Sequence, residues 1–425
     1  MIRFSLFLCV LLCTLSVHAK RIELVLWHGM AGHLGDEVRL LADDFNQQQT
    51  QYFVKPVYKG NYVETLTSFA AAFRAKQPPA MVQIFEVGTA IMHSPKGVIK
   101  PVDELMQEQK IALPKEEFIP SVREFYSKDG QLMALPFNLS TPILYYNLDI
   151  LAKVGYTSAN FPRTWEEMEL LAQQIKKAGY DCTYTTAYPG WILFESFLAI
   201  HGLPLTQGMP ARAVFDTPKL VSHFARLKRW HELHYFRYAG RVDDATILFT
   251  SGLCPLFSQS SGAYNSLAAL VPFRLGVASM PLDSQISPIR HANVAGGAAL
   301  WVVAGQTQEQ YKGIAQFFAF IAQPKTQQRW HEHTGYLPLG MQGIYAGILK
   351  TSHHPNLLLA QTDLKTNVHD KPLRYYGPQN QIRNINDELL EAMFAGLIKP
   401  DEAVHEASTR VNHILFRFSR NIKEG

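Results

Sequence analysis

Cysteine is scarce in this chain of 425 residues, which has only Cys9, Cys13, Cys182 and Cys254. None of them belongs to a C-x-x-C pair, so the sequence gives no support to redox or zinc chemistry. Cys182 and Cys254 lie in separate apolar segments that are typical of strands. In an oxidising compartment they either pair or remain buried thiols, and the sequence leaves both possibilities open.

The chain also lacks a strong excess of one charge and any long apolar segment in its body. It has 40 Lys and Arg against 36 Asp and Glu, a formal charge of +4. No run of basic residues accumulates, which argues against binding of nucleic acid or of a membrane surface. Beyond the first 20 residues, no stretch is apolar and long enough to cross a bilayer.

The motifs of common enzyme classes are missing as well. The P-loop, dinucleotide-binding, nucleophile-elbow and H-E-x-x-H motifs do not occur. His331 and His333, on either side of Glu332, point away from each other on a helix, so we interpret this segment as solvated helix surface. His353 and His354, followed by a proline, are predicted to lie in a loop. We therefore predict a protein that is not an enzyme and that holds no metal or cofactor.

The N-terminus has the pattern of a secretory signal peptide. Arg3 precedes a short apolar run from Phe4 to Val17, and Ala19 offers a small residue for cleavage. A lipoprotein signal is disfavoured because the bulky Leu12 stands before Cys13. We expect cleavage after Ala19 and a soluble periplasmic protein of 406 residues, which is enough for two or three domains.

The first part of the mature chain alternates between strand and helix patterns. Predicted strands are Arg21 to Trp27, Tyr52 to Tyr58 with Pro56 marking an edge, and Met81 to Phe85. Between them lie a helix from Asp36 to Asn46 and a second helix that Asn61 and Glu64 begin as a capping box. The expected buried stripe of this second helix is Leu66, Phe69, Ala70 and Phe73. This order predicts a mostly parallel sheet with helices on both faces.

The pattern restarts after Leu144 to Asn147. Thr164 and Glu167 form a second capping box, and Thr217 with Pro218 begins a long helix. The further predicted strands are Asp181 to Thr186, Leu253 to Phe257, Leu275 to Met280 and Gly297 to Ala304. The further predicted helices are Gln308 to Ile321 and the amphipathic tail from Asp401 to Phe418.

Two such α/β units without a flexible linker predict two lobes that are joined by crossing strands and bind ligand in the cleft between them. Crossings are expected near Pro136 to Ile143 and Pro281 to Asn293, and a third after Tyr336. We assign residues 1–19 to the signal peptide, 20–139 and 292–338 to lobe 1, and 140–291 and 339–425 to lobe 2.

Short motifs follow one another along the mature chain: Trp27-His28-Gly29-Met30, Tyr58-Lys59-Gly60-Asn61-Tyr62, Phe85-Glu86-Val87-Gly88-Thr89-Ala90, Pro136-Phe137-Asn138, Ser140-Thr141-Pro142, Leu144-Tyr145-Tyr146-Asn147, Thr334-Gly335-Tyr336-Leu337-Pro338 and Gln381-Ile382-Arg383. Together they resemble the periplasmic glycerol-3-phosphate-binding proteins of ABC importers. The resemblance covers nearly all of the mature chain. It implies the two-lobed type II binding-protein fold, a monomer, and delivery of the ligand to a membrane permease driven by a cytoplasmic ATPase.

The resemblance also implies a ligand site, with the family's residue type at all seven positions: Tyr62, Glu86, Ser140, Ser260, Gly297, Tyr336 and Arg383. The planar fork of Arg383 suits a phosphate, and Glu86, at a strand end, suits the hydroxyls of glycerol. Tyr62 lies in the first turn of a helix, where an anion is favoured. Gly297 permits close approach of a ligand, although it fits a packing role at a lobe crossing equally well.

One departure from the family pattern concerns an aromatic wall. Where the family has Trp-x-Gly-Trp, this chain has Tyr188-Pro189-Gly190-Trp191. A tyrosine leaves more room beyond the phosphate, and its ring face attracts a quaternary ammonium group. Tyr188 and Trp191 are therefore candidate headgroup residues, and glycerophosphocholine joins sn-glycerol-3-phosphate as a candidate ligand.

Two other functions stay open. A neutral oligosaccharide receptor on the same fold would keep aromatic platforms but would not need Arg383. A secreted phosphodiester hydrolase is disfavoured, because no nucleophile or metal motif supports it.

Overall fold

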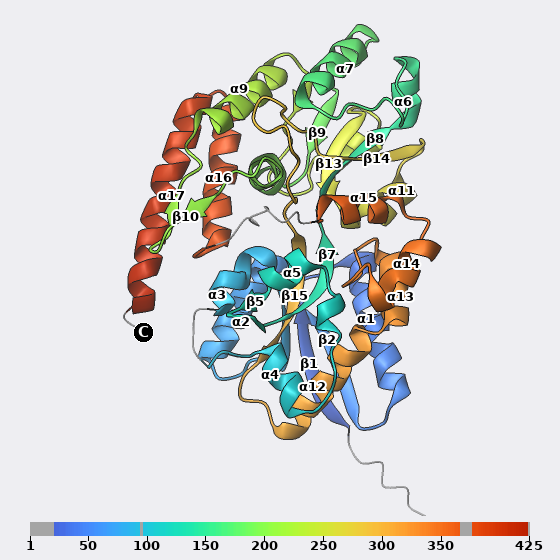
Figure 1. The fold of residues 1–425 in the computed structure, drawn as a ribbon, viewed down its shortest axis with the longest axis vertical. Coiled ribbons are helices and arrows are strands. Elements are labelled where there is room, and N and C mark those ends of the chain that lie inside the picture. Colours follow the sequence, from blue (N-terminus) through green and yellow to red (C-terminus); the bar gives the residue numbers. More distant parts are fainter. Residues whose placement is uncertain (1–20, 94–96, 366–375, 424–425) are drawn as a thin grey trace, which may run out of the picture.

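The computed structural model describes residues 21–93, 97–365 and 376–423, so the predicted signal peptide lies outside the described residues. Figure 1 shows two lobes, one above the other, each built from a central sheet with helices around it. The predicted two-lobed α/β architecture is thereby confirmed. Among the described helices, none is long and apolar enough to cross a membrane.

The sheet of lobe 1 has the order β2-β1-β3-β15-β4, and β7 pairs with β15. Its strands are β1 (Ile22–His28), β2 (Tyr52–Tyr58), β3 (Met81–Phe85), β4 (Ile99–Lys100), β7 (Leu135–Ser140) and β15 (Gly296–Val303). Strand β1 is parallel to β2 and β3, whereas β15 is antiparallel to β3, β4 and β7. The sheet is therefore mixed rather than mostly parallel, because β15 enters from the other lobe. Strand β2, which contains Pro56, lies at the edge as predicted.

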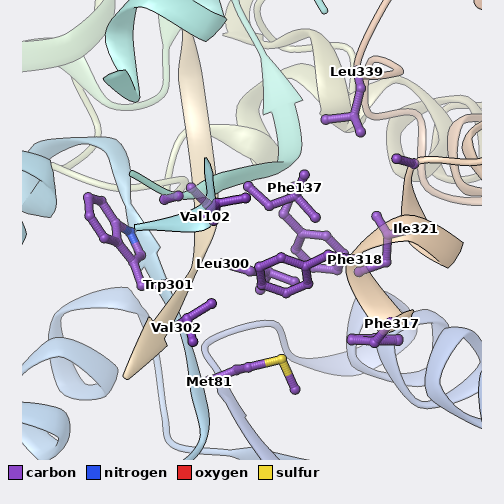
Figure 2. Packing of buried hydrophobic residues seen from close by; sticks show 14 of the residues in the cluster. Met81, Val102, Phe137, Leu300, Trp301, Val302, Phe317, Phe318, Ile321 and Leu339 are labelled. Atoms are coloured by element: carbon purple, nitrogen blue, oxygen red, sulfur yellow. The ribbon is translucent and has the colours of Figure 1, made fainter. Parts of the chain in front are cut away.

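The helices of lobe 1 cover this sheet on both sides: α1 (Gly32–Gln48), α2 (Tyr62–Arg74), α3 (Thr89–His93), α4 (Val102–Glu108), α5 (Pro120–Phe125), α12 (Gln308–Ile321), α13 (Pro324–Thr334) and α14 (Ala346–Thr351). Figure 2 shows Leu300 of β15 beside Phe318 of α12 in the core. Asn61 and Glu64 cap α2 reciprocally, as predicted. In the predicted stripe of α2, Ala70 is exposed, and Thr65 takes its place in the buried face.

The sheet of lobe 2 has the order β12-β9-β13-β8-β14. Its strands are β8 (Pro142–Asn147), β9 (Tyr184–Thr186), β12 (Phe236–Arg237), β13 (Leu256–Ser260) and β14 (Leu275–Ser279). Strand β9 is parallel to β12 and β13, and β8 is antiparallel to β13 and β14, so this sheet is mixed too.

The helices of lobe 2 are α6 (Leu148–Lys153), α7 (Trp165–Lys177), a π-helix η3 (Gly190–Ser196), α8 (Phe197–Ile200), α9 (Pro218–Glu232), α10 (Thr246–Thr250), α11 (Tyr264–Leu270), α16 (Gln379–Phe394) and α17 (Pro400–Lys423). Of these, α7, α9 and α17 begin within one residue of the predicted starts. The capping box of Thr164 and Glu167 begins α7, and Thr217 caps α9. Both caps involve residues only a few positions apart, so they can be predicted without knowing the tertiary fold.

Cys182 and Cys254 form a disulfide, with their Cα atoms 4.8 Å apart. The bond joins the segments that lead into β9 and β13, which are neighbours in the sheet. It settles the alternative that the sequence left open. Both strands begin later than predicted, at Tyr184 and Leu256, after the disulfide.

The chain crosses between the lobes where β7 leads into β8 and where β14 leads into β15. Beyond residue 338, where the sequence analysis begins the second part of lobe 2, the side chains of Leu339, Met341, Tyr345 and Ile348 still lie in the core of lobe 1. Helix α15 (Pro355–Asp363) still contributes Leu357 and Ala360 to this core, and it also contacts β14 of lobe 2. These contacts move the boundary expected at residue 338 toward the C-terminus.

His331 is buried, contrary to the prediction of a solvated surface for this segment. Its ring nitrogens bond the carbonyl oxygen of Tyr336 (2.7 Å) and the hydroxyl of Ser352 (2.8 Å). Burial lowers the pKa of His331 to about 4, so the ring is neutral at physiological pH. Glu332 and His333 are exposed, as predicted, because they lie on another side of helix α13 than His331.

Candidate ligand-binding site

The seven predicted ligand positions lie mostly at the ends of elements where the two sheets meet. Tyr62 begins α2, Glu86 follows β3, Ser140 ends β7 and Ser260 ends β13. Strand pairing sets Ser140 opposite Gly296 and Ser260 opposite Pro142, so both serines flank the first crossing. Gly297 is the second residue of β15, Tyr336 follows α13 and Arg383 lies in α16.

Arg383 joins the two lobes through charged hydrogen bonds. Its Nη1 donates to Glu86 Oε1 of lobe 1 at 2.6 Å. Its Nε and Nη2 donate to the two oxygens of Glu195 in η3, at 2.9 and 2.6 Å. The side chain of Arg383 is only 15% exposed and that of Glu195 is 0% exposed. Buried charges of this kind are costly unless paired, so the three groups hold one another in place.

Glu195 was not predicted as a site residue. The available signal was a carboxylate inside a mostly apolar stretch from Trp191 to Phe197, since a buried charge demands a partner. Burial also raises the pKa of Glu86, and the neighbouring Arg383 works in the opposite direction. Glu86 is therefore a carboxylate whose charge depends on the guanidinium beside it.

Asp387 lies one helical turn after Arg383 and accepts a hydrogen bond from the backbone N–H of Gly190 at 2.7 Å. A side chain at position 190 would collide with Asp387 and crowd Arg383, which accounts for the glycine. Burial raises the pKa of Asp387 to about 7. The carboxyl group thus titrates near physiological pH.

The two predicted tyrosines lie close together on the other side of the site. The hydroxyl of Tyr62 accepts a hydrogen bond from Asn138 Nδ2 at 2.7 Å, and its ring stacks on Phe85. The ring of Tyr336 packs against Gly262 of lobe 2, where an added Cβ would lie 2.6 Å from it. Burial raises the pKa of both phenols, so both keep their protons at neutral pH.

Ser140 and Ser260 differ in what their side chains do. Ser260 Oγ accepts from the backbone N–H of Gly262 at 3.1 Å and thereby begins the 3-10 turn η4 (Ser261–Ala263). Ser140 is buried at the end of β7. Each hydroxyl lies next to a lobe crossing.

Gly297 has a backbone φ of +98°, and an added Cβ would lie 1.8 Å from the carbonyl oxygen of Asn138. The close approach at this position is thus made by the neighbouring strand β7. Of the two roles considered for Gly297, packing at the crossing is the one that these contacts support.

Trp191 and Tyr188 are adjacent to Arg383, Glu86 and Glu195, which we call the ionic group. Trp191 is buried against Gly296, where a Cβ would lie 2.2 Å from the indole ring. Tyr188 is half-buried, and its ring meets that of Trp191 edge-on at 6.4 Å. Burial and the nearby charges of Asp243 and Glu86 raise the pKa of Tyr188, which places its hydroxyl in the same electrostatic environment as Glu86.

A cleft lies between the lobes next to α3. Thr89, Ala90 and His93 of α3 line it from lobe 1, and Met209 and Tyr376 line it from lobe 2. Neither Glu195 nor any of the seven predicted ligand positions lines this cleft. Among the described residues, no three His, Cys, Asp or Glu side chains are arranged to hold a metal ion.

Comparisons with known proteins agree with this architecture. A family model described as bacterial extracellular solute-binding protein matches residues 41–347. The sn-glycerol-3-phosphate-binding periplasmic proteins UgpB of Salmonella typhimurium and Escherichia coli are each 37% identical to the chain over 410 residues, covering 93% of both sequences. The chain belongs to the bacterial extracellular solute-binding proteins. It is a periplasmic binding protein.

Solved structures of other solute-binding proteins share its fold. The GacH receptor of Streptomyces glaucescens has a TM-score of 0.78 at 18% identity, covering 94% of this chain and 99% of the receptor. UgpB from Mycobacterium tuberculosis, in complex with glycerophosphocholine, has a TM-score of 0.77 at 20% identity, with the same coverage. At this identity the likeness shows the two-lobed type II fold, as the sequence analysis predicted.

The crossing of this binding protein should not tolerate a side chain at position 297. Gly297→Ala should lower the free energy of unfolding by more than about 3 kcal/mol, because it combines a left-handed φ with a collision against β7. Urea unfolding checks the value. The matched control is Gly305→Ala, which also has positive φ (+85°) but open space around it, and should cost only about 1 kcal/mol. Equal losses in the two variants would contradict the packing role.

The carboxyl group of Asp387 should make stability depend on pH. Its pKa is raised from 3.8 to about 7 on folding, so its contribution favours the folded state at low pH and is lost as the pH rises toward and through 7. Asp387→Asn keeps an oxygen for Gly190 but removes this titration. The variant should therefore gain stability over the wild type at pH 8, and this gain should shrink toward pH 5. Melting temperatures across this range test it, and a difference that is independent of pH would refute it.

Proposed function

We propose that this periplasmic binding protein captures sn-glycerol-3-phosphate or a glycerophosphodiester, such as glycerophosphocholine, and delivers it to the membrane permease of an ABC importer. The observation that carries the proposal is the buried guanidinium of Arg383 at the junction of the lobes, bonded to Glu86 and Glu195. The 37% identity to sn-glycerol-3-phosphate-binding relatives over nearly the whole chain supports the same ligand class.

The chemistry of the neighbouring groups fits a phosphorylated polyol. A guanidinium binds phosphate oxygens through directed, charge-assisted hydrogen bonds. The carboxylate of Glu86 accepts hydrogen bonds from glycerol hydroxyls, and the phenols of Tyr62 and Tyr336 are protonated donors for an anion. Ser140, Ser260 and Gly297 line the crossing beside these groups and complete the proposed site.

The aromatic pair gives the proposal its second ligand. Tyr188 is half-buried beside Trp191 and shares the surroundings of Glu86 and Tyr336, so it is positioned to face a headgroup beyond the phosphate. An aromatic face attracts the choline cation. The fold relative that was solved with glycerophosphocholine supports a diester as a ligand of this architecture.

A neutral oligosaccharide remains the second candidate, because several structures with this fold contain maltose or related sugars. The ionic group argues against it. A neutral sugar would gain little from the charge of the buried Arg383, whereas a phosphate would gain charge-assisted hydrogen bonds from it.

The proposed activity is binding without turnover, and it needs no metal, cofactor or nucleic acid. The named relatives are binding proteins rather than enzymes. We propose that the protein acts as a monomer until it meets the permease.

Calorimetric titration of the mature protein tests the function directly. Glycerol-3-phosphate or glycerophosphocholine should bind with equal affinity in the presence and absence of EDTA, and maltose should not bind. Mass spectrometry should recover the ligand intact. Tight binding of maltose alone would establish the sugar receptor instead, and steady release of choline or phosphate would establish a hydrolase.

Substitution of Arg383 tests the proposed phosphate contact. Alanine would remove the group that bonds both Glu86 and Glu195, so a loss of stability would confuse the result. Arg383→Lys keeps the charge but not the fork, and it should weaken binding of phosphate ligands by roughly 10- to 100-fold. The matched control is Arg410→Lys, since Arg410 makes a similar two-bond pair with Glu388 outside the proposed site. Unchanged affinity in Arg383→Lys would place the phosphate elsewhere.

A further inference from the structure

A chain of hydrogen bonds runs through buried amides of lobe 1 to the tyrosines of the site. The backbone N–H of Gly29 donates to Gln83 Oε1 at 2.9 Å. Gln83 Nε2 donates to Asn138 Oδ1 at 2.8 Å, and Asn138 Nδ2 donates to the hydroxyl of Tyr62 at 2.7 Å. Gln83 lies on β3 and Asn138 on β7, and both side chains are fully buried. We call Gly29, Gln83, Asn138 and Tyr62 the amide relay.

The direction of the amide relay follows from its first member. A backbone N–H can only donate, so the oxygen of Gln83 must face Gly29 and its NH₂ group must face Asn138. The oxygen of Asn138 must then face Gln83, which turns its NH₂ group toward Tyr62. Each amide orientation is thus determined by the one before it.

At the end of the relay, the hydroxyl oxygen of Tyr62 accepts a hydrogen bond from Asn138, so the hydroxyl proton of Tyr62 points elsewhere. The hydroxyl of Tyr336 belongs to the same group, because hydrogen bonding from Asn138 and Tyr62 partly offsets the rise in its pKa on burial. Tyr336 in turn packs against Gly262 of lobe 2. In such a chain every member accepts a hydrogen bond on one side and donates one on the other. Because the first member is a fixed donor, the last member must also be a donor, here a phenol at the junction of the lobes.

We infer that Gln83 and Asn138 are positioning residues that make the tyrosines of the site hydrogen-bond donors, so that this end of the site selects an acceptor-only group such as a phosphate oxygen. The identity of the ligand rests on the proposed function, which the inference deepens. Neither amide needs to touch the ligand, because their effect is transmitted through the direction of the hydroxyl protons.

Asn138→Asp tests the direction of the relay. The carboxylate still accepts from Gln83, but its second oxygen can only accept from Tyr62, which reverses the phenol. At pH 7.5 the variant should bind glycerophosphocholine roughly 10- to 100-fold more weakly than the wild type. On lowering the pH to 5, the buried carboxyl takes up a proton, and its O–H can replace the lost N–H donor. The ratio of wild-type to variant affinity should then fall by about tenfold or more.

Taking the ratio of wild-type to variant affinity cancels the effect of other groups that titrate in this pH range, because both proteins contain them. Those facing the relay and the site are Glu86, Glu195, Arg383, Asp387, Tyr62, Tyr188, Tyr336 and His28. A phosphodiester is the ligand of choice because, unlike a monoester with a second pKa of about 6, it keeps a single charge throughout.

Asn46→Asp is the matched control. Asn46 is also a buried amide of lobe 1, but its side chain bonds the backbone of Val54 on the edge strand β2. The variant Asn46→Asp should have a lower free energy of unfolding at neutral pH. The ratio of its ligand affinity to that of the wild type should not change with pH. If Asn46→Asp shows the same recovery of binding at pH 5, the recovery reflects buried aspartate in general, and the inference fails.

Gln83→Met provides a second test without a new charge, in case Asn138→Asp does not fold. It removes the anchor to Gly29, so Asn138 can turn either way and Tyr62 loses its fixed direction. We expect glycerophosphocholine affinity to fall by about 3- to 10-fold, with no recovery at low pH. Wild-type affinity in this variant, or a loss in Asn138→Asp that pH 5 does not reverse, would overturn the relay. Failure of the wild type to bind any phosphate ligand would instead overturn the proposed function.

Discussion

The bonds of Arg383 to Glu86 and Glu195 are the constraint on which the arrangement of the site depends. The three charged groups come from α16, the end of β3 and η3, so they connect both lobes. Each is costly to bury alone, and at this meeting point all three are paired. Neighbouring features follow from it, because α16 also carries Asp387, whose bond to Gly190 fixes the start of η3.

The crossing strands impose a second, steric constraint. Because Gly296 has no side chain, the ring of Trp191 packs directly against it, and the backbone of Asn138 packs against Gly297 in the same way. These two glycines therefore bring η3 of lobe 2 and β7 of lobe 1 against the same short segment of β15. The same contact places Asn138 where it reaches Tyr62, so packing at the crossing and the polarity of the site share one cause.

The site combines two kinds of polar environment. On one side lie charged groups whose ionisation depends on one another, with the pKa of both Glu86 and Asp387 raised by burial. On the other side lie neutral phenols whose protons are directed by buried amides. The proposed ligand suits such a combination, because it offers both acceptor-only phosphate oxygens and donor hydroxyls.

The sequence by itself predicted the local elements and the protein family. Capping boxes at Asn61 and Thr164 and the apolar stripe of α12 act over a few residues, so they could be predicted without the fold. The seven candidate ligand residues were predicted from motif resemblance, whereas Glu195, Gln83 and Asn138 acquire their partners only from distant segments. Strand direction, the Cys182–Cys254 bond and the burial of His331 were likewise decided by tertiary structure, because each depends on which remote segment packs alongside.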